Sequence, residues 1–203
     1  MKIGIIGAGR VGLGIGGAFA AAGHDVGYAG REPGRTVEGL PPGAVLASIP
    51  ETIAASDAVV VTVPGGAVPD LLAAHGAALA GGLVLDATNQ RSGGPTEPMH
   101  QVPAFLAAAP GIRLYRAFCT LGYEHFIDPQ RTGATADLHF CGPDGDDRST
   151  VESLVASLGL RPVWIGGLDT ADVLDGATRL WFALAARPDV GRDVTFHTQG
   201  LDR

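Results

Sequence analysis

The chain has 203 residues, a formal net charge of −7 and 46% hydrophobic residues, which is enough apolar material for one buried core. The negative charge, without a basic stripe or tail, argues against nucleic acid or an anionic membrane as the main partner. Cys119 and Cys141 lack metal-ligand spacing, so we expect neither a metal site nor a disulfide framework. No apolar run is long enough to span a bilayer and no signal peptide is recognisable, so we expect a cytoplasmic protein.

Residues 1–35 carry the most informative pattern of the chain. An apolar run at 3–6 precedes a glycine-rich segment, a small-residue helix pattern at 13–22 and a second apolar run at 26–29. This order of strand, glycine turn, helix and strand suits the pyrophosphate of a dinucleotide, which binds at the free N–H groups of the helix N-terminus. The competing interpretation is a glycine-rich turn without a ligand. The residues that we expect to contact the dinucleotide are Gly7, Ala8, Gly9, Arg10, Val11 and Gly12.

The end of the second strand indicates which dinucleotide binds. An NAD site usually places Asp or Glu there to accept from the ribose 2′-OH, but this chain has Gly30 followed by Arg31. A guanidinium can bind a 2′-phosphate bidentately, and Arg35 adds a second cation nearby. We therefore predict NADP(H) rather than NAD(H), with Gly30, Arg31 and Arg35 at the site. The alternative is that both arginines are ordinary surface charges.

Strand and helix patterns continue to alternate along the chain. We expect strands at 44–47, 57–63, 83–87, 112–118, 136–141 and 162–165, and helices at 50–56, 68–79, 102–109, 123–126, 151–158 and 171–186. This alternation predicts an α/β fold with a doubly wound parallel sheet (Rossmann, NAD(P)-binding) and a small C-terminal strand–helix extension. We treat 1–203 as a single domain, with a softer division near residue 118 and a C-terminal cap. The last helix is expected to bury Val173, Ala177, Leu180, Trp181 and Leu184.

Ligands of open parallel sheets lie at the carboxyl ends of the strands, so the residues that follow each strand are candidates for the second half of the site. Pro64 would stiffen the wall beside the nicotinamide ribose, and Asn89 would bridge the nicotinamide half to a second substrate. Gly65, with Gly66, would leave space for a ring or give N–H groups. Plain loop chemistry is the alternative for Pro64 and Asn89. The predicted set is Val63, Pro64, Gly65, Asn89, Cys119 and Thr120.

No catalytic side-chain constellation is recognisable, so we predict no catalytic residue. Lys2 is the only lysine, and the six histidines are scattered along the chain. His125 is the histidine best placed for a cleft. Cys119 points toward the same crevice, but we interpret it as a buried, inert thiol. Hydride transfer between two ring cofactors needs no protein acid or base, because the chemistry belongs to the cofactors. This favours an oxidoreductase that transfers hydride between NADP(H) and a second ring cofactor.

The chain resembles the NADPH-dependent reductases of the deazaflavin coenzyme F420 over nearly its full length. The segments that carry the resemblance are residues 1–35, Val61-Thr62-Val63-Pro64, Leu85-Asp86-Ala87-Thr88-Asn89, the stretches 116–122 and 136–142, Leu180-Trp181 and Gly191-Arg192-Asp193. The resemblance implies NADP in the glycine loop, Arg31 on the 2′-phosphate and the deazaflavin ring near Pro64, Cys119 and Thr120. It also implies a homodimer through the C-terminal helix.

Three positions depart from the pattern of that family. Gly30 stands where serine is common, Gly65 where a bulky aromatic residue often follows the proline, and Cys119 where asparagine is usual. The changes at Gly65 and Cys119 fall where the second substrate would sit. An NADP(H)-dependent reductase of another acceptor, such as an imine, a flavin or a ferric chelate, is therefore an alternative. A non-catalytic NADP(H)-sensing module is another.

Overall fold

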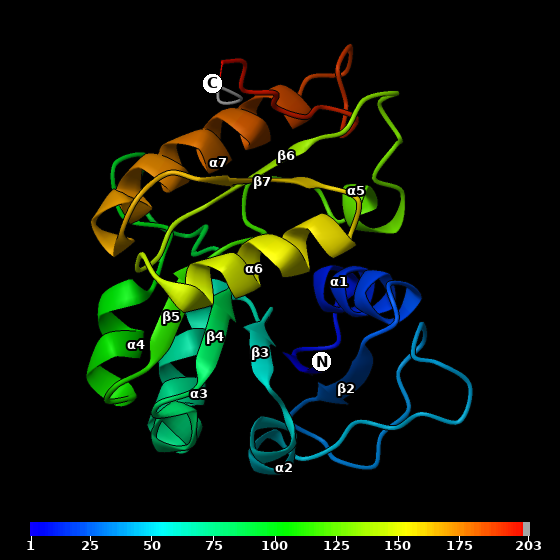
Figure 1. Ribbon diagram of the computed structural model, residues 1–203, viewed down its shortest axis with the longest axis vertical. Helices are drawn as coiled ribbons and strands as arrows, with labels where there is room; N and C mark the ends of the chain where they lie inside the picture. Colours follow the sequence, from blue (N-terminus) through cyan, green and yellow to red (C-terminus); the bar gives the residue numbers. More distant parts are fainter. Residues whose placement is uncertain (201–203) are drawn as a thin grey trace.

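The computed structural model describes residues 1–200 and is built on a sheet of five parallel strands (Figure 1). In spatial order the strands are β2 (Asp25–Ala29), β1 (Lys2–Ile6), β3 (Ala58–Val61), β4 (Leu83–Asp86) and β5 (Arg113–Arg116). All residues of β3 and β4 are buried, as their continuous apolar sequences require when helices cover both faces of a parallel sheet. The predicted doubly wound parallel sheet is confirmed.

Helices cover the sheet on both faces and create two cores. On one face Ile5 packs in a core with residues of α1 and α6, whereas Ile6 belongs to a second core with residues of α2, α3 and α4. Neighbouring residues of a strand point to opposite faces, so a single short strand contributes to both cores. The helices are α1 (Arg10–Ala21), α2 (Ile49–Ala55), α3 (Val68–His75), α4 (Val102–Ala108), α5 (Glu124–Ile127), α6 (Asp146–Ser157) and α7 (Ala171–Ala185).

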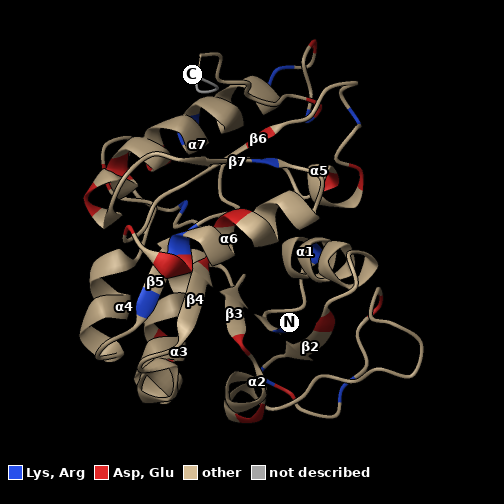
Figure 2. Ribbon diagram, in the orientation of Figure 1, with Lys and Arg blue, Asp and Glu red and all other residues tan. Residues whose placement is uncertain are grey.

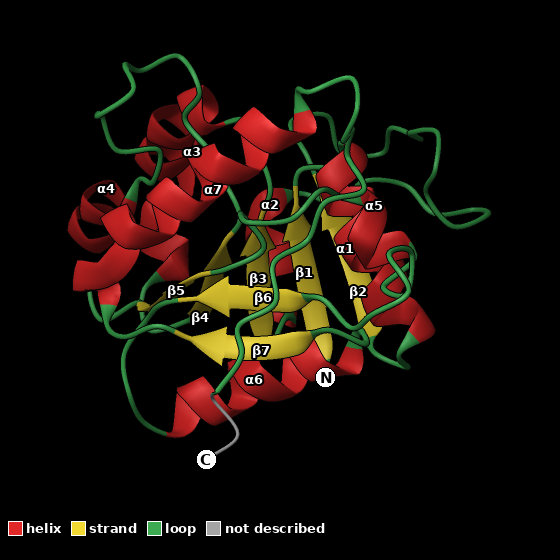
Figure 3. Cartoon of the chain, turned by 90° about the horizontal axis from the view of Figure 1, so that it is seen from above, coloured by secondary structure: helices red, strands yellow, loops and turns green. Residues whose placement is uncertain are grey.

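The last part of the described chain adds a small parallel pair, β6 (Asp137–Phe140) with β7 (Arg161–Trp164). Figure 3 shows these strands running across the direction of the main sheet. One antiparallel bridge between Arg116 and Cys141 joins the pair to β5, with hydrogen bonds of 2.9 and 3.1 Å. This arrangement is the small C-terminal strand–helix extension that the sequence predicts; the division near residue 118 stays a prediction.

The C-terminal segment 191–198 lies against the extension and is held by the buried carboxylate of Asp137. Arg161 donates to Asp137 from Nε at 2.7 Å and from Nη2 at 2.9 Å, and the backbone N–H of Thr198 donates to it at 2.5 Å. Burial alone would raise the pKa of Asp137, but these hydrogen bonds outweigh burial and lower the pKa below its usual range. The carboxylate therefore ties a distant segment to β6 in its ionised form.

The strand expected at 44–47 is reduced to one parallel bridge between Ala47 and Ala29. The backbone of Leu46 bonds instead to the turn that follows β2, with N–H to Arg35 O at 2.9 Å and its carbonyl accepting from Gly34 N at 2.7 Å. Those bonds curl the segment away from the ladder after one residue. The bridge nevertheless occupies the position beyond β2 that the third strand takes in the dinucleotide-binding order 3-2-1-4-5.

The prediction for the inner face of α7 was wrong except at Trp181. Val173 and Leu180 are 67% and 52% exposed, and Ala177 and Leu184 are only half-buried. The face that packs inward consists of Ala171, Leu174, Asp175, Thr178 and Trp181. A buried carboxylate and hydroxyl lie on it, so counting only apolar residues selects the outer stripe.

Acidic and basic residues are interspersed along the ribbon (Figure 2). None of the helices formed by residues 1–200 has the length and apolar character that crossing a membrane needs.

Candidate functional site

The glycine-rich loop lies between β1 and α1, beside the end of β3. The chain leaves β1 toward β2 on one side and returns to β3 on the other, so this is the switch point of the sheet, where doubly wound folds bind ligands. Thr62 ties the two loops together, because its Oγ1 donates to Gly7 O at 2.7 Å. A Cβ on Gly12 would lie 1.9 Å from that same carbonyl oxygen. Only glycine therefore allows α1 to begin this close to β1.

The outer side of the loop is open to an anion. Gly7 adopts a φ of +110°, which glycine tolerates and which turns the chain sharply after β1. Gly9 is exposed, and a Cβ built on it would meet no heavy atom within 4 Å. Gly9 is also the N-cap of α1 and no side chain caps the helix, so the first N–H groups stay available for a ligand. Ala8, Arg10 and Val11 complete this partly open surface.

Arg31 and Arg35 follow β2 at the same edge of the sheet, and both are exposed. Arg35 is paired with Glu32 at 3.0 Å, whereas Arg31 joins no ion pair within residues 1–200. Gly30, which precedes them, is packed against Leu46, and a Cβ there would come within 2.8 Å of Leu46 Cδ1. The departure at Gly30 thus has a packing reason, and Arg31 is the arginine of the two whose charge is not already matched by a carboxylate.

The expectation that Gly65 leaves space for a ring was wrong. Gly65 is buried, and a Cβ on it would lie 2.4 Å from Gln90 N, so backbone that follows β4 already fills the space. Pro64 is exposed and begins a 3₁₀ turn, Gly65–Ala67, while Val63 is half-buried against the core under α3. The glycine therefore brings the loops after β3 and β4 into contact.

Asn89 is held by a buried arginine that the sequence analysis did not single out. Arg116, at the end of β5, donates from Nη2 to Asn89 Oδ1 at 2.8 Å and from Nη1 to Thr88 O at 2.7 Å. Because Arg116 occupies the amide oxygen of Asn89, the amide N–H₂ is the group that Asn89 can offer to a ligand. The half-buried Asn89 is thus an oriented hydrogen-bond donor at the carboxyl edge of β4.

Two buried carboxylates balance the charge of Arg116. Asp175 Oδ1 accepts from Arg116 Nε at 3.0 Å and Nη2 at 2.6 Å, and Asp86 Oδ2 accepts from Nη1 at 3.3 Å. Burial works against the guanidinium charge, but the neighbouring Cys119, Asp86 and Asp175 raise the pKa of Arg116 overall, so it stays protonated. Burial raises the pKa of Asp86, although the charge of Arg116 and the hydrogen bonds from Thr88 act to lower it. The cluster connects β4, β5 and α7.

Cys119 and Thr120 do not line an open cleft. Phe118 adopts a φ of +63°, unusual for a bulky residue, and this turn sends the following residues into the interior. Cys119 is 3% exposed and Thr120 is fully buried. Burial raises the pKa of the Cys119 thiol, which also interacts with Thr178. The inert-thiol interpretation therefore fits the structure, and direct ligand contact by these side chains does not.

His125 is also buried rather than placed in a cleft. Its Nε2 lies 3.2 Å from Arg192 O, and its Nδ1 is buried without a hydrogen-bond partner within residues 1–200.

His100, Asp172 and Asp175 are close enough to suggest a metal site. However, both oxygens of Asp175 already accept hydrogen bonds, and Arg116 places a positive charge beside them. Asp175 therefore has no carboxylate oxygen to spare for a cation, and Asp172 is the only carboxylate of the trio that could bind one.

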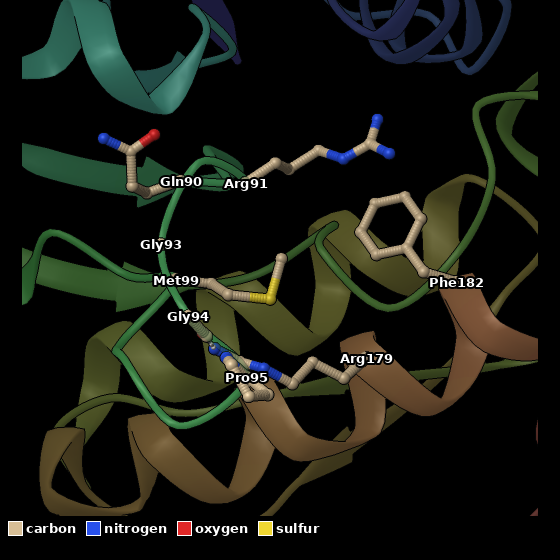
Figure 4. A pocket seen from close by; sticks show the side chains of 8 residues that line it. All are labelled: Gln90, Arg91, Gly93, Gly94, Pro95, Met99, Arg179 and Phe182. Carbon is tan, nitrogen blue, oxygen red and sulfur yellow. Dashed lines mark hydrogen bonds between the residues drawn. The ribbon is translucent and has the colours of Figure 1, made fainter.

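A pocket of about 270 Å³ lies beyond Asn89, between the loop after β4 and α7 (Figure 4). Arg91 extends over the ring of Phe182, with its guanidinium carbon 4.5 Å from the ring centroid. Arg179 reaches from α7 to the loop and donates to the carbonyl oxygens of Gly94 and Glu97. Between the strand predicted at 83–87 and the helix predicted at 102–109, the sequence analysis singled out only Asn89. The pocket forms only because α7, which comes much later in the chain, brings Arg179 and Phe182 to this loop.

A doubly wound sheet with a glycine loop at the switch point and an unpaired arginine after the second strand defines the class of NAD(P)-binding Rossmann-type proteins. Residues 2–90 match the family model described as NADP oxidoreductase coenzyme F420-dependent. This confirms the resemblance that the sequence motifs indicate. No curated protein matches the chain.

Solved structures share the fold. A candidate F420-dependent NADP reductase from Arthrobacter sp. FB24 superposes with a TM-score of 0.85 at 24% identity, covering 98% of this chain and 100% of that one. A reductive aminase from Aspergillus terreus, in complex with NADPH and ethyl levulinate, has a TM-score of 0.63 at 26% identity and covers 90% of this chain. The match covers only 63% of the aminase, so this chain spans less than two thirds of its length.

Proposed function

We propose that the protein binds NADP(H) at the glycine loop and transfers hydride between the nicotinamide and a second ring cofactor, the deazaflavin F420. The observation that carries the proposal is the cradle at the switch point, where Gly7 and Gly12 fit only as glycines and Arg31, exposed at the strand end, has no ion pair among residues 1–200. The open N–H groups of α1 suit a pyrophosphate, and the Arg31 guanidinium suits a 2′-phosphate. When bound, the nicotinamide supplies the hydride.

In this proposal the residues of the chain position the ligands. Asn89, with its oxygen occupied by Arg116, turns its N–H₂ toward the nicotinamide half, and Pro64 stiffens the neighbouring wall. His125, the histidine that the sequence places best for a cleft, and Cys119 are both buried. Direct transfer between rings is compatible with that burial, because binding and orientation supply the catalysis. With a deazaflavin bound, the hydride would be accompanied by uptake of one proton from solvent, for which no side chain of the site is needed.

A binding experiment tests the cofactor assignment. Arg31→Ala should weaken NADPH binding about 10- to 100-fold and leave NADH binding nearly unchanged, since hydrogen bonds to a charged group contribute about 1.5–3 kcal/mol. Arg113→Ala is a matched control, because Arg113 is an exposed arginine at the amino end of β5. Equal losses for NADPH and NADH would contradict the 2′-phosphate assignment.

The acceptor is tested by following the absorbance of NADPH and of oxidised F420 together. Equimolar loss of both bands supports the proposed transfer, and NADPH binding without turnover of any acceptor favours a sensing module. An imine reductase is the second candidate, favoured by the likeness to the Aspergillus terreus enzyme. NADPH oxidation with a ketone and an amine, but not with F420, would select it.

We also propose that the protein forms a homodimer through α7. Val173 and Leu180 lie on the outer stripe of that helix and are 67% and 52% exposed. A second copy of the chain would cover this stripe. Leu180→Glu should convert a dimer to a monomer in light scattering after gel filtration, whereas a wild-type monomer would contradict the proposal.

We further propose that residues 1–203 fold as a single domain. The Arg116 cluster joins β4, β5 and α7, so the main sheet and the C-terminal extension share buried charges. One unfolding transition observed by two probes supports this, and two separate transitions would contradict it.

A further inference from the structure

The pocket beyond Asn89 has two arginine side chains and no ion pair. Arg91 and Arg179 both line it, and neither is paired with a carboxylate within the described residues. The carboxylate of Glu97 lies beside Gly93 and Gly94, where a Cβ built on Gly93 would come within 2.7 Å of its Oε2. In a chain with a net charge of −7, two neighbouring guanidinium groups without acidic partners form a local positive site.

The arginines are held in place from different directions. The Phe182 ring supports Arg91 by a cation–π contact, which favours one orientation of an otherwise flexible side chain. Arg179 is bound to the carbonyl oxygens of Gly94 and Glu97, so the loop and α7 are joined at the pocket. Arg91 accordingly presents free N–H donors to the pocket, and a guanidinium binds phosphate or carboxylate bidentately.

Apolar side chains form one part of the remaining wall, and the space is small. Pro95, Met99 and Phe182 line the pocket together with the arginines (Figure 4). Its volume of about 270 Å³ is below the ~300–1,000 Å³ typical of sites that enclose a whole ligand. It therefore suits one end of a larger molecule, an oxyanion with a short apolar neighbour.

The pocket adjoins the place where the nicotinamide half of the cofactor is proposed to lie. Gln90 lines the pocket, and its backbone N is the atom that a Cβ on Gly65 would meet at 2.4 Å. Asn89, the oriented donor, is its chain neighbour. A ligand whose ring lies beside Asn89 can thus reach Arg91 with a charged substituent.

We infer that this pocket binds the anionic tail, a phosphate or carboxylate, of the second ligand. The inference rests on the proposed function, since it deepens the assignment of the same site. Arg91 binds the oxyanion, Arg179 shapes the loop, and Phe182 and Met99 contact the apolar part of the tail.

The first test uses phenyl phosphate as the probe, titrated calorimetrically with and without saturating NADP⁺. Arg91→Gln should weaken its binding at least 10-fold, while Arg113→Gln, which removes an exposed arginine from the opposite edge of the sheet, leaves binding unchanged. Phenyl phosphate should bind more tightly than inorganic phosphate, because the apolar walls contribute. An Arg91→Gln variant that binds as well as wild type would overturn the inference. Equal affinity for inorganic phosphate would overturn the tail assignment in favour of a free anion.

The second test compares F420 with its tail-less deazaflavin nucleoside as acceptors. Wild type should have a lower KM for F420, and Arg91→Gln should raise that KM toward the tail-less value without changing the KM of the tail-less acceptor. If wild type turns over neither acceptor, the proposed function fails, and the phenyl phosphate comparison still decides whether the pocket binds anions. If Arg91→Gln turns over both acceptors as wild type does, the proposed function stands and the pocket assignment fails.

Discussion

Replacing Asp175 by asparagine tests the buried cluster with a minimal change of shape. Asp175 Oδ2 accepts from Met99 N at 2.6 Å and His100 N at 3.0 Å, and Oδ1 accepts from two nitrogens of Arg116. In Asp175→Asn one of these oxygens becomes an N–H₂ group, so two donors face another donor. Arg116 also loses a counter-charge in the protein interior.

Breaking a buried pair in this way costs about 3–5 kcal/mol, because the remaining charge stays buried without compensation. Asp86 still faces Arg116, which places the expectation near the lower end of that range. A loss of about 3–4 kcal/mol is a large part of the ~5–15 kcal/mol that stabilises a typical domain. With an m-value of about 2 kcal/mol/M, the urea midpoint should fall by about 2 M.

The assay is equilibrium unfolding in urea, followed by the fluorescence of Trp181, which is 2% exposed on the same helix. Asp172→Asn is the matched control, because the Asp172 side chain is 75% exposed and forms an ion pair with His100 at 3.3 Å. It should change stability by less than about 0.5 kcal/mol. Equal effects of the two substitutions, or a loss below about 1 kcal/mol for Asp175→Asn, would refute the assigned dependence of Arg116 on Asp175.

Three further predictions follow from local geometry. Gly12→Ala places a Cβ 1.9 Å from a backbone oxygen and should cost about 1–3 kcal/mol or more and abolish NADPH binding, whereas Gly17→Ala, which meets nothing within 4 Å, should be neutral or stabilising in thermal melts. Because the pKa of Asp137 is lowered in the folded protein, its ionised form stabilises the fold above the unfolded pKa of about 3.8, and this stabilisation is lost as the pH falls below that value. Asp137→Asn should be less stable than wild type at pH 7, and its free energy of unfolding should fall less on acidification. Free energies of unfolding that fall equally with pH in both proteins would contradict the anchor role. Burial raises the pKa of the Cys141 thiol to about 12 and also raises the pKa of the Cys119 thiol. Iodoacetamide at pH 8 should therefore label neither cysteine in the native protein and both after unfolding, as measured by mass spectrometry. Rapid labelling of the native protein would disprove their burial.

Much of the fold could be predicted because its signals are local. Continuous β-branched runs predict buried parallel strands, and the spacing of Gly7, Gly9 and Gly12 predicts a loop that opens a helix. The strand predicted at 44–47 is a single bridge in the structure, because hydrogen bonds to a nearby turn replace further pairing with β2.

Burial of side chains near the site was harder to predict. The sequence places Gly65 and Cys119 at strand ends, where open loops are the rule, yet Gly65 meets the backbone of Gln90 and Cys119 is turned inward after Phe118. Both outcomes depend on how neighbouring loops pack, and a single strand-end motif carries no information about its neighbours. Sequence alone also placed the outer stripe of α7 inside, because apolar periodicity ignores a buried carboxylate.

By itself, the sequence determined the alternation of strands and helices, the glycine cradle at the first turn and the arginine after the second strand, because each is encoded by residues close together in the chain. Only the tertiary structure decided that Arg116 meets Asp175, a residue 59 positions away, and that Arg91 meets Phe182 across a pocket. Such pairs form when separate elements dock, and their energies depend on burial and charge that no local pattern records.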